Sequence, residues 1–99
     1  MENFTMTGGA RIGYANATWP FAKLTVDKNK LELNVRLLGN FVFAPGDVIS
    51  IEPFGLIPVI GKGIRINHRV GKYNKKIVFW TMGNADAVIE KIRATGFLI

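Results

Sequence analysis

The sequence predicts a mainly β domain, a partly open barrel of about seven antiparallel strands capped by one C-terminal α-helix. Short apolar runs recur about every 8–12 residues with turn residues between them, which is typical of an all-β barrel or sandwich. Several runs alternate apolar and polar side chains, as half-buried strands do. Near the C-terminus the apolar period changes to the helical one. The 99 residues are enough for a single domain, residues 1–99, with residues 1–8 as a tail.

Seven segments carry the strand pattern. The expected strands cover residues 11–16, 21–26, 31–36, 41–43, 48–53, 64–70 and 76–81. A polar turn over residues 27–30 predicts a hairpin between the second and third strands, because its Asp and Asn residues tolerate positive φ. In the fifth strand, Ile49 and Ile51 are expected to face inward, while Ser50 and Glu52 face water.

The last expected strand is apolar on both faces. Ile77 and Phe79 point to one side of it, and Val78 and Trp80 point to the other. If the first pair faces the core, the second pair lies on the outer surface of the barrel. We therefore expect an apolar outer face at this strand.

The helix is expected over residues 85–95. Asn84 is placed to cap its first turn, where the negative charge of Asp86 favours the positive end of the helix dipole. Gly96 followed by Phe97 fits a glycine-terminated helix with a hydrophobic contact behind it. One apolar stripe at spacings of i, i+3, i+4 and i+7 is formed by Ala85, Val88, Ile89 and Ile92.

This order of elements and four sequence stretches resemble the small bacterial pleckstrin-homology-like (PH-like) proteins. The stretches are Trp19-Pro20-Phe21-Ala22-Lys23-Leu24-Thr25-Val26, Val48-Ile49-Ser50-Ile51-Glu52, Gly63-Ile64-Arg65-Ile66-Asn67-His68 and Ile77-Val78-Phe79-Trp80. The resemblance covers roughly residues 9–97. It implies a bent sheet plugged by the helix, and an adaptor that binds lipid headgroups, peptides or other copies of such domains. Phosphoinositide-binding members carry basic residues between their first two strands. Residues 16–20 hold none here, which puts that site in doubt.

The composition points to a cytoplasmic protein, with peripheral attachment to a membrane as an open alternative. The chain has no cysteine, so we expect no disulfides and no thiolate chemistry, as suits a reducing compartment. The N-terminus does not resemble a secretory signal. The most apolar stretch, residues 54–60, is far shorter than the roughly 20 residues of a membrane-spanning helix.

Candidate catalytic residues are scarce, and we expect neither an enzyme nor a cofactor. His68 and Ser50 are the only histidine and the only serine, both fall on expected strands, and no third member of a triad is apparent. Because His68 alternates with two isoleucines, we expect a structural histidine. One histidine with scattered carboxylates also makes a poor metal site. The glycine-rich run over residues 55–63 has the wrong spacing for a phosphate-binding loop.

That run is unusual because it is apolar where the strand pattern predicts a loop. One interpretation is a hydrophobic tip that enters a bilayer or the groove of a partner, assisted by Lys62 and Arg65. The alternative is that the loop folds back over the barrel or extends a strand. The apolar candidates for binding are Leu56, Ile57, Val59 and Ile60, together with Trp80 on the neighbouring strand.

The second candidate surface is a basic patch. The net charge is +6, and no acidic residue occurs from Gly55 to Ala85. Arg65 and Arg69 are expected to share an outward face with Trp80 close enough for a cation–π contact. The patch fits a phosphate or carboxylate partner, or it is a solvated hairpin whose lysines prevent strand-to-strand aggregation. Its members are Lys62, Arg65, Arg69, Lys72, Lys75 and Lys76.

These features favour a non-catalytic interaction module that binds a protein or an anionic membrane surface. Self-assembly through Val78 and Trp80 is the alternative from a different class. Nucleic-acid binding ranks third, because most of the phenylalanines fall in core positions or loops and not on one basic face. No metal partner is expected.

Overall fold

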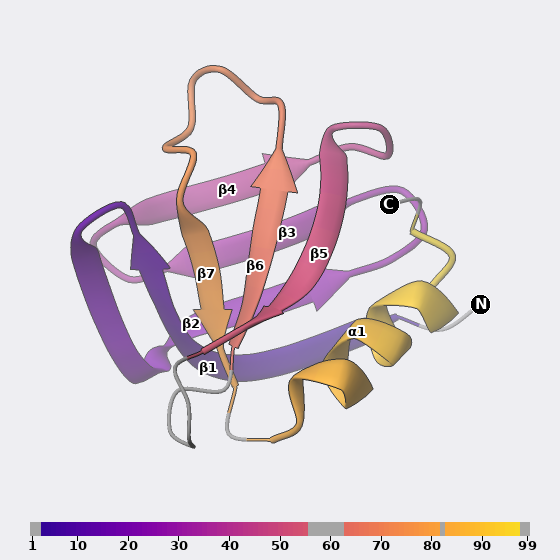
Figure 1. Cartoon of the computed structure of the whole chain (residues 1–99), viewed down its shortest axis with the longest axis horizontal. Coiled ribbons are helices and arrows are strands. Elements are labelled where there is room, and N and C mark those ends of the chain that lie inside the picture. The colour runs from indigo at the N-terminus through magenta and orange to yellow at the C-terminus, as the bar shows by residue number, and fades with distance from the viewer. Residues whose placement is uncertain (1–2, 56–62, 82, 98–99) are drawn as a thin grey trace.

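The computed structural model describes residues 3–55, 63–81 and 83–97. It contains seven strands in a single antiparallel sheet, with the order β4-β3-β2-β1-β7-β6-β5. The sheet curls into a half-barrel, and the helix lies at one end of it (Figure 1). The expected fold class is therefore confirmed. The elements are β1 (Phe4–Ile12), β2 (Ala15–Val26), β3 (Leu31–Val35), β4 (Gly39–Phe43), β5 (Val48–Phe54), β6 (Gly63–His68), β7 (Ile77–Trp80) and α1 (Ala85–Ala94).

The core fills the concave side of the curled sheet. Alternate residues of β2 and β3 enter it as the period-2 pattern predicts, for example Leu24 opposite Leu33. The helix contributes Val88, Ile89 and Ile92, which are buried where α1 packs on β5 and β6. One continuous apolar cluster thus joins sheet and helix.

Both ends of α1 are capped as the sequence predicts. The Asn84 side-chain oxygen accepts hydrogen bonds from the backbone N–H groups of Asp86 at 2.7 Å and Ala87 at 3.3 Å. At the other end, Gly96 adopts a φ of 87°, and Phe97 behind it is buried in the core.

The N-terminal expectations were wrong. Residues 4–8 are not a tail, because β1 pairs with β2 from Phe4 opposite Val26 to Ile12 opposite Ala15. The expected strand over residues 11–16 spans the turn between β1 and β2, where Gly13 has a φ of 62°. Phe4 and Met6 are half-buried against the core, and this short alternation is the signal that was missed.

The orientation of Ile49 was also wrong. A β-bulge lies between Val48 and Ser50, where the register of β5 against β6 shifts. The extra residue breaks the alternation, so Ile49 is 54% exposed while Val48 and Ile51 are both buried.

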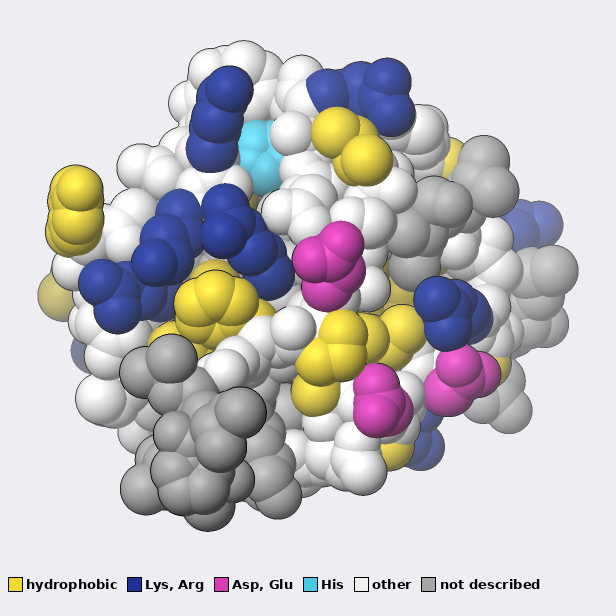
Figure 2. Space-filling view, viewed as in Figure 1, with side chains coloured by type: hydrophobic (Ala, Val, Ile, Leu, Met, Phe, Trp, Pro, Cys, Tyr) yellow, Lys and Arg dark blue, Asp and Glu magenta, His cyan; other side chains and the backbone are white. Residues whose placement is uncertain are grey.

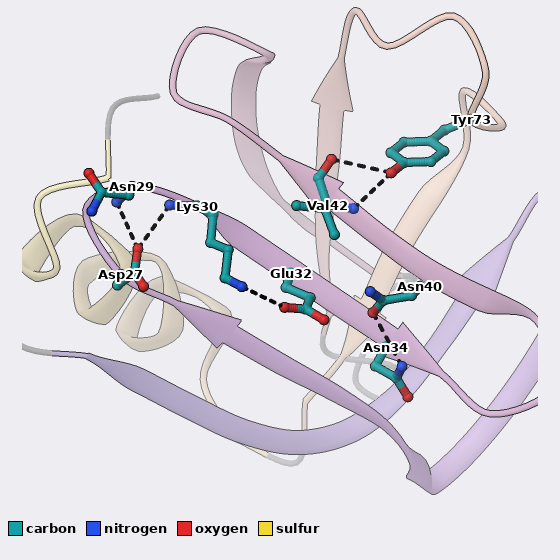
Figure 3. Close-up of polar contacts among 8 residues, drawn as sticks. All are labelled: Asp27, Asn29, Lys30, Glu32, Asn34, Asn40, Val42 and Tyr73. Atoms are coloured by element: carbon teal, nitrogen blue, oxygen red, sulfur yellow. Dashed lines mark hydrogen bonds and ion pairs between the residues drawn. The ribbon is translucent and has the colours of Figure 1, made fainter.

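The open edge of β4 is held by one tyrosine (Figure 3). The Tyr73 hydroxyl accepts a hydrogen bond from the backbone N–H of Val42 at 3.0 Å and donates to its carbonyl at 3.3 Å. The Tyr73 ring packs edge-on against Phe41 and Phe43, with ring centroids 5.1 and 5.4 Å apart. Tyr73 therefore attaches the segment between β6 and β7 to the opposite edge of the sheet.

His68 lies beside this aromatic cluster, with its ring 5.0 Å from that of Phe43. Its Nδ1 accepts a hydrogen bond from the backbone N–H of Val70 at 3.0 Å, which leaves Nε2 to donate to the carbonyl of Asn74 at 2.9 Å. Both ring nitrogens are used by the backbone, as expected of a structural histidine.

Replacing Tyr73 by phenylalanine should lower the free energy of unfolding by about 1 kcal/mol, because both hydrogen bonds to Val42 are lost while the ring stays. Urea denaturation measures the change. Tyr14→Phe is the matched control, since the Tyr14 side chain is 99% exposed. Equal stability of the two variants would show that the Tyr73 hydroxyl does not hold the β4 edge.

Candidate functional site

The outer face of the sheet carries a group of cations and aromatic rings at β7. Arg11 of β1 and Arg65 of β6 lie directly opposite Val78 on its two sides. Lys76 and Trp80 lie two residues before and after Val78, so their side chains share its face. We call Arg11, Phe54, Arg65, Lys76 and Trp80 the basic–aromatic face. We expected Val78 to be exposed on the outer face. It does point away from the core, but it is fully buried.

Trp80 packs against the sheet. Its neighbours across the two adjacent strands are Gly9 and Gly63. A Cβ atom on Gly63 would lie 2.7 Å from Cε3 of the indole, so the ring rests directly on the Gly63 backbone. The Phe54 ring lies 5.8 Å from the Trp80 ring, and Trp80 Nε1 donates to the Asn16 side-chain oxygen at 3.2 Å. These contacts fix the orientation of a half-buried indole.

The cations on this face have no acidic partner in the described part of the chain. The two ion pairs found there lie elsewhere, Lys30 with Glu32 on β3 and Glu90 with Arg93 on α1. Lys76 Nζ lies 5.6 Å from the centroid of the Phe54 ring. Figure 2 shows Lys and Arg side chains gathered beside hydrophobic surface over β7. Among the described residues, no cation of this face forms an ion pair.

The buried Arg65 Nε has no hydrogen-bond partner among the described residues. Arg65 is half-buried, and Glu52 is its neighbour across the β5–β6 ladder. Glu52 instead accepts a hydrogen bond from the Ser50 hydroxyl at 3.3 Å. A buried N–H without a partner is costly, and because this atom is buried it is not among the donors that the face offers to a partner.

Glu32 is the described carboxyl whose pKa is clearly shifted. Hydrogen bonding from Asn40 and then from Lys30 lowers its pKa from the ordinary 4.5. Figure 3 shows the ion pair with Lys30, at 3.2 Å. It lies on β3, three strands away from β7 in the sheet order. Its negative charge is thus paired locally and placed away from the basic–aromatic face.

The structure divides the expected basic patch. Arg65 and Lys76 lie near Trp80, whereas Arg69, Lys72 and Lys75 are exposed beyond the ends of β6 and β7. Among the described residues no cation–π contact joins Trp80 to Arg65 or Arg69, contrary to expectation. Arg69 lies past the end of β6, whereas Trp80 pairs with Gly63 at its start. The candidates that lie outside the described residues are Leu56, Ile57, Val59, Ile60 and Lys62.

A groove of about 520 Å³ adjoins the basic–aromatic face, between β7 and the β1–β2 turn. We call it the aromatic groove, because Tyr14, Trp19 and Trp80 line it together with Arg11. Tyr14 is 99% exposed and Trp19 is 57% exposed. No carboxylate of the described residues lines it. Sequence reasoning missed this groove, because it placed residues 16–20 in a loop and not in β2.

Comparison with protein-family models, curated proteins and solved structures found no match to this chain. Within the described residues, no group of three or more acidic or histidine side chains is placed to hold a metal ion. The described part of the chain also has no helix with the length and apolar character needed to cross a membrane.

Proposed function

We propose that this protein is a non-catalytic interaction module of the PH-like kind, which binds an anionic partner through the basic–aromatic face. The observation that carries the proposal is the group of three cations, Arg11, Arg65 and Lys76, which lies around an indole without ion pairs to the described residues. Seven antiparallel strands followed by a C-terminal helix are the order of elements that the resemblance to PH-like proteins implies.

The chemistry of the face favours a partner with phosphate or carboxylate groups. Arginine offers several N–H donors to such groups in a planar fork that suits two-point contacts. Binding to an anionic membrane surface would be stabilised by about 1 kcal/mol for each Lys or Arg that lies near that surface. An acidic protein surface offers the same attraction, and in either case the contact weakens as salt rises.

Self-assembly is less well supported than it was from the sequence. That alternative needs Val78 and Trp80 on one exposed face, but Val78 is 0% exposed within a single chain. Trp80 alone is a small apolar surface for a stable interface.

The double variant Arg65→Gln and Lys76→Gln should weaken binding to heparin and to phosphatidylserine vesicles by roughly 30-fold at low salt, about 1 kcal/mol per removed charge. Vesicle co-sedimentation and heparin titration measure the change. The control is Lys28→Gln with Lys91→Gln, which removes the same charge from exposed positions elsewhere.

The control should bind almost as tightly as the unmodified chain. An equal loss in both double variants would mean that only net charge matters. No binding of the unmodified chain to either polyanion at low salt would contradict the proposed function itself.

A further inference from the structure

We propose that the anionic partner is a single-stranded nucleic acid, whose bases stack in the aromatic groove while its phosphates bind the cations of the basic–aromatic face. This inference rests on the proposed function and names the class of ligand for the same surface. Single-strand binders combine aromatic stacking surfaces with a positive groove that follows the backbone. Both parts are present here, and they adjoin each other.

Trp80 supplies a stacking surface. Its indole rests on the backbone of Gly63, where a Cβ atom would lie 2.7 Å from Cε3 of the ring, and its hydrogen bond to Asn16 holds the ring in place. The half-buried indole lines the groove.

Tyr14 and Trp19 also line the groove, and both side chains are largely exposed. Exposed aromatic rings that line one recess suit flat, π-rich groups. A volume of about 520 Å³ is enough for a nucleotide. Lipid headgroups offer charge but no flat ring, so these walls favour a base over a headgroup.

Arg11 connects the stacking surface with the cations. Arg11 lines the aromatic groove and also belongs to the basic–aromatic face. Its Nε donates to the carbonyl of Gly13 at 3.2 Å, which directs the guanidinium, and its terminal nitrogens make no hydrogen bond to the described residues. A phosphate bound by Arg11 would therefore be joined to a base in the groove.

From the sequence, nucleic-acid binding ranked third among the functions, because most of the phenylalanines fall in core positions or loops and not on one basic face. The rings that the structure gathers are two tryptophans and a tyrosine instead. They come from positions 14, 19 and 80, which only the β1–β2 and β1–β7 pairings bring together. The reason for the low ranking therefore does not apply to this groove.

The test measures fluorescence anisotropy of labelled oligo(dT) and oligo(rU) of about 12 nucleotides, within the site sizes of single-strand binders. Trp19→Ala and Tyr14→Ala should each weaken binding by about 5- to 150-fold, the usual range for loss of one stacked base. Ile49→Ala is the matched control, because Ile49 is an exposed apolar residue at the far end of β5. It should leave oligonucleotide binding unchanged.

Two further readouts separate stacking from charge. Arg11→Gln should reduce the slope of log affinity against log salt by about 0.7, the value for one phosphate contact on a single strand. Trp19→Phe leaves Trp80 as the sole tryptophan, whose fluorescence should be quenched by oligonucleotide but not by heparin, which has no bases.

Heparin or phosphatidylserine vesicles that bind while oligonucleotides do not would overturn this inference and leave the proposed function standing. Oligonucleotide affinities that stay unchanged in both aromatic variants would overturn it in the same way. Failure of every polyanion to bind would overturn the inference and the proposed function together.

Discussion

Phe79→Ala should lower the free energy of unfolding by about 3–5 kcal/mol, the range for removing a buried phenylalanine ring. Phe79 is fully buried at the centre of the sheet, opposite Ala10 on β1 and Ile64 on β6. Its ring also packs closely on the Gly8 backbone, where a Cβ atom would lie 2.7 Å from Cζ of the ring. A loss of this size is a large part of the stability of a domain of this length.

Urea denaturation followed by circular dichroism measures the effect. Phe21→Ala is the matched control, because it removes the same ring from a side chain that is 43% exposed. It should cost well under half as much. If the two variants unfold at the same urea concentration, the concave side of the sheet is not the main core.

Gly63→Ala should lower the free energy of unfolding by about 1–3 kcal/mol through overpacking. It should also displace Trp80. The new methyl group would lie 2.7 Å from the indole and 2.9 Å from the carbonyl oxygen of Phe79. The indole must then leave the position that it occupies against the sheet, and the aromatic groove loses one of its walls.

Near-UV circular dichroism and tryptophan emission report the displacement, and denaturation reports the stability. Gly71→Ala is the control, because no heavy atom lies within 4 Å of the site of its added methyl group. It should be neutral, or stabilising by up to about 1 kcal/mol. Unchanged tryptophan spectra in Gly63→Ala would contradict the described packing of Trp80.

Local patterns in the sequence predicted most of this fold. The alternation in β2 and β3 identified the hairpin and its buried face, since a strand with one face in the core repeats every second residue. Asn84 and Gly96 marked the two ends of the helix through their own side-chain and backbone chemistry. These signals lie within a few residues of one another.

The errors arose where structure depends on pairing between distant segments. The strand that begins at Phe4 is defined by its ladder with β2, and its own apolar alternation is short. The exposure of Ile49 follows from a bulge that only the register with β6 shows. Burial of Val78 on the outer face likewise requires knowledge of its neighbours on β1 and β6.

The candidate site was predicted only in part for the same reason. Arg65, Lys76 and Trp80 were named because they lie close together in the sequence. Arg11, Tyr14 and Trp19 were not, because about 60 residues separate them from Trp80. Gly63, on which the Trp80 ring rests, had no visible role until the strands were paired.

The two hydrogen bonds between Tyr73 and Val42 affect whether copies of this chain can associate through the β4 edge. An unpaired edge strand offers donors and acceptors on which the strand of another molecule can form a ladder, leading to domain swapping or fibrils. Here one phenol already occupies the N–H and the carbonyl of Val42. Lys72 lies 5.5 Å from the centroid of the same ring, so an incoming strand would also have to desolvate an ammonium group. Tyr73 and Lys72 thus protect the β4 edge against intermolecular strand addition.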